Sequence, residues 1–449
     1  MNSQKSRYNI RLWFWTNMYF LLVVFVFSTA WAQHPLVLEL PSSLNPVGSG
    51  ARALGMGGAF ISVADDATAA SWNPGGLVQL EKPEMSVVLG SLWRSEDKHF
   101  ENHPEASGED EVSELSLNYL SVAYPFDLAE RNMVVSLNYQ NLYEFNRDWS
   151  YSYNYPATSI YSGPAQFEYE QQGALYALGL AYSADITTNF SAGLTINYWG
   201  DFIYENSWEQ KYDTNAKFNL SGLQIDYTNH KTEEYVFEGW NAVIGFLYRI
   251  NEQLTLGGVF KSPFTADIQH TVSENEETVF TTNRIETYSA SNQQDAELNM
   301  PMSYGIGLAY RFSDSFTIAG DIYRTHWDDF TLERDQGIET SPISGKNIDE
   351  SDVDPTTWFR LGTEYLIITE QFVFPVRGGI FYDPAPADGS PDDYFGFSLG
   401  GGIGYQRYIF DIAYQFRRGN DVNASMWQGE NLPIDVTEHK LYCSLIMYF

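Results

Sequence analysis

Large apolar residues alternate with small or polar residues along most of the chain beyond about residue 84. Between residues 302 and 312 the large residues occupy the even positions and Gly, Ala, Ser or Arg the odd positions, and 133–140 and 408–416 show a similar alternation. A period of two predicts β-strands with one apolar face and one small or polar face. Because soluble sandwiches also alternate in this way, the pattern alone does not decide between a soluble and a membrane protein.

The spacing of the strands does favour one of these. We predict fourteen strands, at 84–93, 115–125, 131–143, 168–184, 189–203, 233–250, 253–262, 295–312, 314–327, 356–368, 374–383, 394–404, 407–417 and 438–449. Long and short connections alternate along this series, and segment 215–228 could form an extra hairpin arm. Outer-membrane barrels combine an even strand number with short turns at one end and long loops at the other. The sequence therefore predicts an all-β, transmembrane, antiparallel β-barrel over 84–449.

Composition and charge exclude several other classes of protein. The chain has 449 residues, 25 Lys+Arg against 58 Asp+Glu, and a formal net charge of -33. A mean hydropathy of -0.30 argues against a bundle of transmembrane helices. The acidic balance argues against nucleic-acid partners, which need a basic face. Cys443 is the single cysteine, so an intramolecular disulfide or a cysteine-based zinc site is excluded.

The first 32 residues have the pattern of a secretory signal peptide. Lys5, Arg7 and Arg11 precede an apolar run at 18–27, and small residues at Ala30 and Ala32 fit a cleavage site after Ala32. An uncleaved membrane anchor is the alternative, but the apolar run is short for one. We therefore expect export through the inner membrane.

A glycine-rich segment lies between this leader and the first strand, and we assign 33–83 to it. Tight turns are expected at Gly55, Gly57 and Gly58, and Asn73-Pro74-Gly75 is a strong turn sequence. Between them stands the acidic pair Asp65 and Asp66. Its position suits a plug, or hatch, folded into the lumen of the barrel.

The letters GARALGMGGA (50–59), ADDATA (64–69) and NPGGL (73–77) resemble the opening of the FadL/TodX family of outer-membrane transporters, and most closely that of its PorV-type relatives. The family hatch usually reads Asn-Pro-Ala, and Gly75 stands here in the place of Ala. The resemblance implies a fourteen-stranded barrel with an N-terminal hatch. It also implies passive uptake of hydrophobic molecules, such as long-chain fatty acids or hydrocarbons.

In that family the ligand can leave sideways through a gap beside a kinked strand, which we expect here among strands two to four. The alternative function is that of the PorV-type relatives, which bind exported proteins for a secretion system. A third possibility is a barrel that mainly braces the outer membrane.

The ends of the strands suggest further partners. The final strand alternates up to Phe449, which resembles the signal read by the barrel-assembly machinery. Acidic residues crowd segment 96–114 and could bridge to lipopolysaccharide through divalent cations, although a solvated acidic loop is the simpler interpretation. Aromatic residues near strand ends are expected to form girdles at the interfaces with outer-membrane lipid: Trp93, Tyr124, Tyr143, Trp199, Trp327, Trp358 and Tyr382.

Catalysis has little support in the sequence. Gly396-Phe397-Ser398-Leu399-Gly400 matches a nucleophile elbow, but that motif needs a strand-to-helix turn and here lies within an alternating strand. The run His326-Trp327-Asp328-Asp329 could bind a metal or serve as a base, although a loop cluster without function is the simpler interpretation. We expect no enzyme activity, no cofactor and no metal.

Several charged residues occupy positions that should face the lumen, because charges facing lipid are costly. Three are arginines: Arg311, Arg360 and Arg377. Three are acidic: Asp321, Glu364 and Asp411. One interpretation is a network of salt bridges that holds the hatch. The other is that an arginine binds a ligand carboxylate, for which the guanidinium group is well suited.

Overall fold

The computed structural model describes residues 48–101, 103–155, 162–220, 222–282, 284–334, 337–423 and 432–449, all within the unit Val37–Phe449. The predicted leader 1–32 and residues 33–47 of the predicted hatch lie outside the described residues. Fourteen strands pair in one antiparallel circuit that closes where the last strand meets the first. In order these are β1 (Glu84–Lys98), β2 (Gly108–Leu128), β3 (Arg131–Glu144), β5 (Gly163–Thr187), β6 (Phe190–Trp199), β8 (Leu223–Arg249), β9 (Leu254–Lys261), β12 (Ser303–Ser313), β13 (Phe316–Thr325), β16 (Thr356–Ile368), β17 (Phe372–Tyr382), β18 (Tyr394–Tyr405), β19 (Tyr408–Asn423) and β20 (Pro433–Tyr448).

This closed barrel confirms the predicted fold class and the predicted strand number. The short connections are tight hairpins at one end of the barrel. Between β2 and β3, for example, Ala129 and Glu130 both adopt positive φ angles, of 54° and 60°. Two successive left-handed residues give the turn a twist that matches that of the flanking strands.

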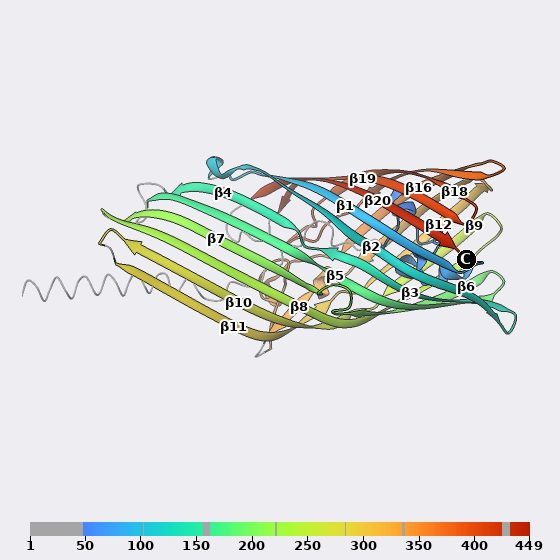
Figure 1. Cartoon of the computed structure of the whole chain (residues 1–449), viewed down its shortest axis with the longest axis horizontal. Helices are drawn as coiled ribbons and strands as arrows, with labels where there is room; N and C mark the ends of the chain where they lie inside the picture. Colours follow the sequence, from blue (N-terminus) through green and yellow to red (C-terminus); the bar gives the residue numbers. More distant parts are fainter. Residues whose placement is uncertain are drawn as a thin grey trace, which may run out of the picture. The chain divides into compact units, whose positions relative to one another are not determined.

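The other end of the barrel carries long strand extensions, which the sequence patterns did not reveal apart from the hairpin arm suggested at 215–228. They are β4 (Arg147–Tyr155), β7 (Ser207–Leu220), β10 (Phe264–Phe280), β11 (Ile285–Met300), β14 (Thr331–Arg334) and β15 (Ile338–Thr340). Each of β4, β7 and β10 follows a barrel strand after a short break. β4 pairs with β5, β7 with β5 and β8, and β10 with β8, all along the parts of β5 and β8 that extend beyond the closed barrel. Figure 1 shows β4, β7, β10 and β11 reaching beyond the end that lies opposite the C-terminus.

The two faces of the barrel wall differ as alternation requires. Large apolar side chains are exposed on the outside of the wall, for example Ile306 (60%), Leu180 (61%) and Ile380 (60%). The residues next to them in the sequence, such as Gly307 and Gly379, lie on the inner face together with their register partners Asp321 and Gly362. An apolar exterior around a polar or small interior is the arrangement of a barrel in a bilayer.

The inner face packs against the segment Gly48–Lys82, which we call the hatch segment. It contains two short helices, α2 (Ala51–Gly55) and α3 (Ala69–Trp72), and the 3₁₀ helix η1 (Pro74–Gln79). Its apolar residues, among them Met56, Phe60 and Leu77, are buried in one cluster with wall residues such as Ala181 and Ala319. The described part of the segment therefore packs against the inner face of the barrel wall.

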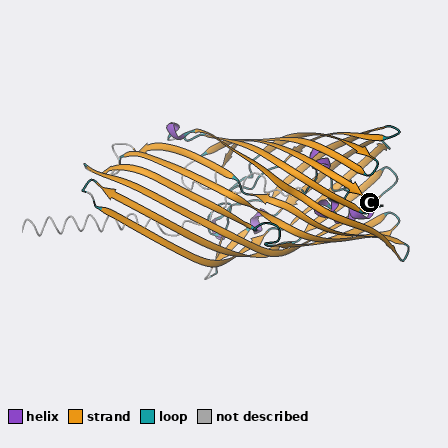
Figure 2. Ribbon diagram, viewed as in Figure 1, coloured by secondary structure: helices purple, strands orange, loops and turns teal. Residues whose placement is uncertain are grey.

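Helices are otherwise few and short in the described part of the chain (Figure 2). Three single 3₁₀ turns lie in the long connections: η2 (Pro104–Ala106), η3 (Trp327–Asp329) and η4 (Ile348–Glu350). None of the described helices has the length and apolar character needed to cross a membrane.

Candidate functional site: the hatch segment, the lumen cavity and the wall

The hatch segment is seated against glycines of the barrel wall. A Cβ atom at Gly257 would lie 2.6 Å from the carbonyl oxygen of Ile61, and one at Gly379 would lie 2.6 Å from that of Met56. At Gly400 it would lie 2.9 Å from Cα of Gly55. Real side chains do not approach backbone this closely, so these wall positions allow contact only because they lack a side chain.

The turn at Asn73-Pro74-Gly75 joins the hatch segment to the opposite side of the wall. The Asn73 side chain accepts a hydrogen bond from Gly75 N (3.1 Å) and donates to Ile61 O (2.7 Å) and Phe246 O (2.9 Å). It thereby caps η1, holds a second part of the segment and reaches β8. The motif that carries the family resemblance therefore anchors the segment.

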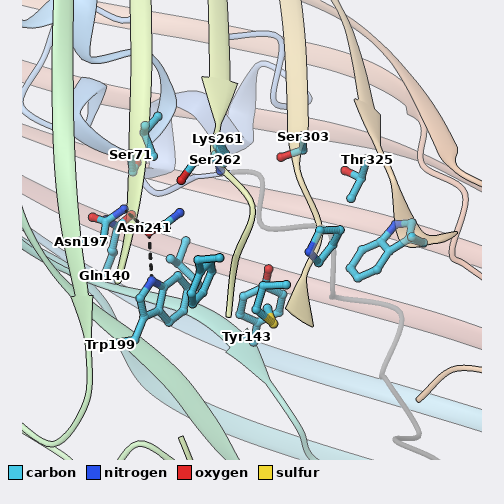
Figure 3. Close-up of a pocket in the computed structure, with 16 residues that line it drawn as sticks. Ser71, Gln140, Tyr143, Asn197, Trp199, Asn241, Lys261, Ser262, Ser303 and Thr325 are labelled. Atoms are coloured by element: carbon cyan, nitrogen blue, oxygen red, sulfur yellow. Dashed lines mark hydrogen bonds between the residues drawn. The ribbon is translucent and has the colours of Figure 1, made fainter. Parts of the chain in front are cut away.

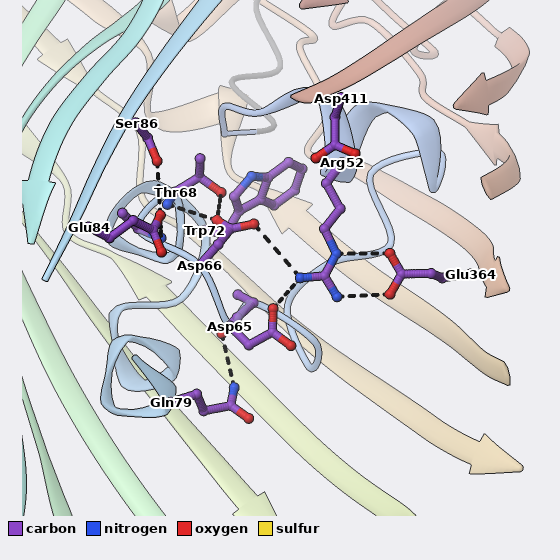
Figure 4. Close-up of polar contacts among 12 residues, drawn as sticks. Arg52, Asp65, Asp66, Thr68, Trp72, Gln79, Glu84, Ser86, Glu364 and Asp411 are labelled. Carbon is purple, nitrogen blue, oxygen red and sulfur yellow. Dashed lines mark hydrogen bonds and ion pairs between the residues drawn. The ribbon is translucent and has the colours of Figure 1, made fainter. Parts of the chain in front are cut away.

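A buried ionic cluster fixes the first helix of the segment (Figure 4). Arg52 of α2 donates two hydrogen bonds to Glu364 of β16, at 3.0 and 2.9 Å, and also pairs with Asp65 and Asp66. Burial lowers the pKa of Arg52, but the neighbouring carboxylates more than offset this and hold its pKa above the usual value. Two-point pairing fixes both distance and orientation.

The same cluster continues around the wall. Arg377 of β17 donates to Glu364 and to Asp411 of β19, both at 2.6 Å. Glu364 thus accepts from a hatch arginine and a wall arginine together. This arrangement favours the interpretation that Arg377 belongs to a salt-bridge network that holds the hatch segment, because its Nε and Nη1 groups both donate to carboxylates of the wall.

Other wall side chains bind the backbone of the hatch segment. Asp321 of β13 accepts from Phe60 N (2.6 Å) and Ile61 N (2.9 Å). Arg360 of β16 donates to Gly57 O at 2.9 Å, and Ser398 of β18 donates to Gly55 O at 3.2 Å. Gly57 and Gly58 both have positive φ angles at this point, which explains the glycines in the motif.

A cavity of about 540 Å³, including the part open to solvent, adjoins α3 at Ser71 in the lumen (Figure 3). Its lining comes from six barrel strands, β3, β6, β8, β9, β12 and β13, from the extensions β10 and β11, and from Ser71 of α3. The large lining side chains are Leu142, Tyr143, Trp199, Val243, Phe264, Met300, Pro301 and Trp327. Polar groups are interspersed, and Trp199 Nε1 donates to Asn241 Oδ1 at 2.9 Å. Its lining, mainly apolar and aromatic with a few polar groups, is that of a small-molecule site.

A second cavity of about 320 Å³ shares Ser71 and Lys261 with the first and reaches the hatch segment at Gly58 and Trp72. Arg360 and Asp321 also line it. Lys261, at the end of β9, lies 5.9 Å from the ring centroid of Tyr323. Lys261 was not among the residues predicted to face the lumen, although its inward position follows from its alternation with Gly257 and Val259.

The barrel wall is incomplete beside the larger cavity. β2 and β3 pair only from Tyr119–Gln140 to Leu128–Arg131. Beyond Tyr119 and Gln140, toward the end of the barrel that carries the strand extensions, β2 pairs with β1 alone. The described residues of β3 and β4 there pair with β5 alone. A bulge at 141–143 in β3 and the break between β3 and β4 interrupt this side of the seam, opposite β2. This open seam lies within strands two to four, where a gap was expected.

The cavity reaches the seam through three residues of β3. Gln140, the last paired residue, lines the cavity together with Leu142 and Tyr143. The larger cavity therefore adjoins the part of the wall where β2 and β3 do not pair with each other.

Two sequence expectations are corrected by these positions. Arg311 lies near the end of β12, beside the hairpin turn, where its side chain is 55% exposed and pairs with Asp314 at 3.0 Å, so it contacts neither cavity. The predicted aromatic girdle is also wrong in part. Trp93 and Tyr124 are exposed, but four other members are buried inside: Tyr143, Trp199, Trp327 and Trp358. Three of these line the larger cavity.

The remaining candidate motifs have local roles. Ser398 of the elbow-like sequence faces the hatch segment, as its bond to Gly55 shows. His326, Asp328 and Asp329 come together at a rim, with His326 Nδ1 3.5 Å from Asp328 Oδ1, and both acidic residues are exposed. Phe449 donates its N–H to Pro83 O at 2.9 Å.

Comparisons with known proteins agree with this geometry. Among solved structures, the toluene transporter TodX of P. putida has a TM-score of 0.57 at 14% identity, over 90% of this chain and 99% of that one. The monoaromatic hydrocarbon channel CymD has a TM-score of 0.53 at 14% identity, over 90% and 98%. The toluene transporter TbuX of Ralstonia pickettii has 0.51 at 13%, over 90% and 99%. At these identities the likeness shows a shared fold.

A search of curated proteins gives no match. The family model described as outer membrane protein transport protein (OMPP1/FadL/TodX) matches residues 43–402. This match covers most of the chain, including the hatch segment and the barrel through β17. The chain therefore belongs to the OMPP1/FadL/TodX family of outer-membrane transport proteins, and it is a β-barrel of the outer membrane rather than a member of an enzyme family.

Proposed function

We propose that the protein takes up hydrophobic small molecules, hydrocarbons or long-chain fatty acids, by passive transport across the outer membrane. The observation that carries the proposal is the aromatic-lined cavity of about 540 Å³, which lies between the outer extensions and the hatch segment. Apolar ligands gain roughly 0.8 kcal/mol per buried CH₂ group, so such a cavity needs few polar contacts to retain them. The named hydrocarbon transporters of the same fold support this substrate class.

The proposed route has three parts. A ligand enters among the outer extensions, is held in the cavity next to α3, and leaves sideways through the open seam between β2 and β3. The hatch segment closes the direct path below the cavity, anchored by Asn73 and Arg52. In this scheme the hatch motif acts as a closure, and the continuity of Leu142 and Tyr143 with the seam supports the lateral exit.

Ligands with a carboxylate have one further contact in this proposal. Of the three predicted arginines, Arg360 lines the smaller cavity, and Lys261 lines both cavities. A tail in the larger cavity would place a head group near these two cations. Arg377 and Arg311 are engaged with Asp411 and Asp314 instead.

The test is uptake by cells that carry the barrel in their outer membrane. Labelled dodecanol should enter these cells faster than cells without the protein. Trp199→Ala, which removes one wall of the cavity, should lower the protein-dependent rate about tenfold or more, since the ligand loses a large apolar contact surface worth about 1.5–3 kcal/mol. The matched control is Trp93→Ala on the exposed outer face. Equal uptake with and without the protein would contradict the proposal.

A further inference from the structure

The open seam has an inner and an outer mouth, which two neighbouring residues of β3 mark. Gln140, in the last β2–β3 pair, lines the larger cavity. Tyr139 precedes it and faces the same side as Leu137, which is 54% exposed on the outer face of the wall. Successive residues of a strand face opposite sides. A molecule that leaves the cavity past Gln140 therefore emerges beside Tyr139.

The outer mouth is covered by aromatic rings. Tyr139 is only 3% exposed, in contrast to Leu137. Its ring stacks on that of Tyr176 of β5, with centroids 5.5 Å apart. The ring of Tyr204 lies 5.5 Å from that of Tyr176 and 6.4 Å from that of Tyr139. Tyr204 belongs to the connection between β6 and β7, residues 200–206, which we call the β6–β7 loop. This loop therefore crosses the outer face of β5 and reaches the edge of the seam.

The β6–β7 loop is fixed at its ends. β6 and β7 both pair with β5 and β8, so the loop leaves the sheet and returns to it between the same two strands. The Asn206 side chain exchanges two hydrogen bonds with the backbone of Tyr176, at 2.7 and 3.1 Å, and Asn206 O accepts from Phe237 N at 2.8 Å. Residues 201–205 are all exposed. Among the described residues, no hydrogen bond holds the tip at 202–204.

The tip of the loop is apolar. Phe202, Ile203 and Tyr204 are 65%, 45% and 53% exposed. Just before the loop, the ring of Tyr198 lies 4.7 Å from that of Trp240 of β8, which is 61% exposed on the outer face. Exposed aromatic residues on the outer face of a barrel mark its interface with lipid. The tip continues this apolar surface, so the outer leaflet of the membrane is the partner that fits it.

One buried group opposes the closed position of the loop. The hydroxyl group of Tyr139 is buried and has no hydrogen-bond partner in the described structure. Burying such a group is unfavourable, whereas the contacts of Tyr204 with two other rings are favourable. These opposing contributions suit a cover that can be displaced.

We propose that the β6–β7 loop is a lid on the outer mouth of the seam, with its tip in the outer leaflet, and that it must move before a ligand passes from the cavity into the bilayer. The inference rests on the proposed function and adds a regulated step to its lateral exit. With the lid closed, Tyr204 covers the mouth. With the lid displaced, Tyr139 is uncovered and the ligand passes directly among the acyl chains around the tip.

The first experiment locks the lid. In a Cys443→Ser background, Tyr176→Cys/Tyr204→Cys is joined by a short bis-maleimide with a cleavable spacer, and uptake of labelled dodecanol is measured in cells that carry the barrel. Because release through a closed lid is blocked, crosslinking should lower protein-dependent uptake about tenfold or more, and cleavage should restore it. Tyr204→Cys alone, treated with the same reagent, is the matched control and should keep its uptake. If the double variant does not fold, Tyr139→Cys/Tyr204→Cys replaces it.

The second experiment places the tip. Phe202→Cys in the same background carries a fluorophore, and the barrel is embedded in bilayers with brominated acyl chains. Quenching should be at least about threefold stronger than for the same label at Glu168→Cys, an exposed position on the outer part of β5, because an interfacial apolar segment lies near the acyl chains.

The outcomes separate the lid from the function on which it rests. Unchanged dodecanol uptake by the crosslinked barrel would overturn the lid and leave the proposed function standing. A label at residue 202 that is quenched no more than one at residue 168 would overturn the contact with the outer leaflet. Absence of protein-dependent uptake by the wild-type barrel would overturn the proposed function and the lid together.

Discussion

Replacing Gly379 of β17 by alanine should unseat the hatch segment, whereas the same change at the preceding residue should not. A Cβ atom at Gly379 would lie 2.6 Å from Met56 O and closer still to Gly57 N, both of which are backbone atoms that cannot rotate away. At Gly378, which faces the other side of the wall, the nearest atom is Ser398 O at 3.9 Å. The two positions form a matched pair on one strand.

The expected size of the effect follows from that overlap. Overpacking a close-packed site costs about 1–3 kcal/mol. If the cost falls on the seated state, the unseated fraction rises by about 5- to 150-fold, since 1.4 kcal/mol corresponds to a factor of ten. Gly378→Ala should change that fraction less than about twofold, because nothing needs to move.

Thiol accessibility reports the seating directly. Ser62 of the hatch segment is 3% exposed and its hydroxyl has no hydrogen-bond partner in the described structure, so Ser62→Cys is a nearly isosteric probe. With Cys443 replaced by serine, the labelling rate by a water-soluble maleimide measures the unseated fraction. Gly379→Ala should accelerate labelling into the stated range. Equal rates in the two alanine variants would refute the account of the glycine seat.

Three further predictions concern the ionic cluster around Glu364, the larger cavity and the side chain of Lys261. Glu364→Gln leaves Arg52 and Arg377 without their shared carboxylate, and should destabilise the seated barrel by about 3 kcal/mol in thermal unfolding, compared with the exposed control Glu168→Gln; an unchanged melting temperature would contradict this. Phe264→Ala should weaken dodecanol binding to the purified barrel about tenfold or more, measured by calorimetry, since it removes a large apolar wall of the cavity; unaltered affinity would place the ligand elsewhere. Lys261→Gln should weaken dodecanoate binding about tenfold and leave dodecanol binding unchanged; equal losses for both ligands would argue for packing rather than charge.

The sequence predicted the barrel well because strand alternation is a local property. At 305–308, for example, inward glycines alternate with outward Ile and Leu, so the face of the wall to which each residue belongs follows from the residues close to it in the sequence. The extensions were harder, because the far part of a segment such as β10, residues 273–277, carries polar and acidic residues on both faces and shows no apolar period. Their strands depend on pairing with β8 and β11, which the local pattern does not record.

The site could be predicted only in part, for the same reason. The hatch motif was found because of its many glycines and its Asn-Pro-Gly turn. Arg360 and Arg377 were found because charged residues in a barrel strand are expected to face the lumen. Trp199 and Tyr143 were placed in a lipid girdle, because an aromatic residue at a strand end suits either side of the wall. A bulge, such as the one at 141–143 in β3, reverses inward and outward positions, and only the register between strands reveals it. Arg311 was placed among the lumen residues because the alternation does not show that it lies at the end of β12, next to a turn residue, Asp314, with which it pairs.

The cavity is the part of the account on which the proposed function depends most. The direct measurement is mass spectrometry of small molecules that co-purify with the folded mature barrel in a non-lipidic detergent, for the wild-type protein and for Trp199→Ala. The account predicts hydrophobic molecules in near-stoichiometric amount with the wild type, and their loss from the variant. An empty wild-type barrel that instead retains an exported protein would contradict it and favour a role in secretion.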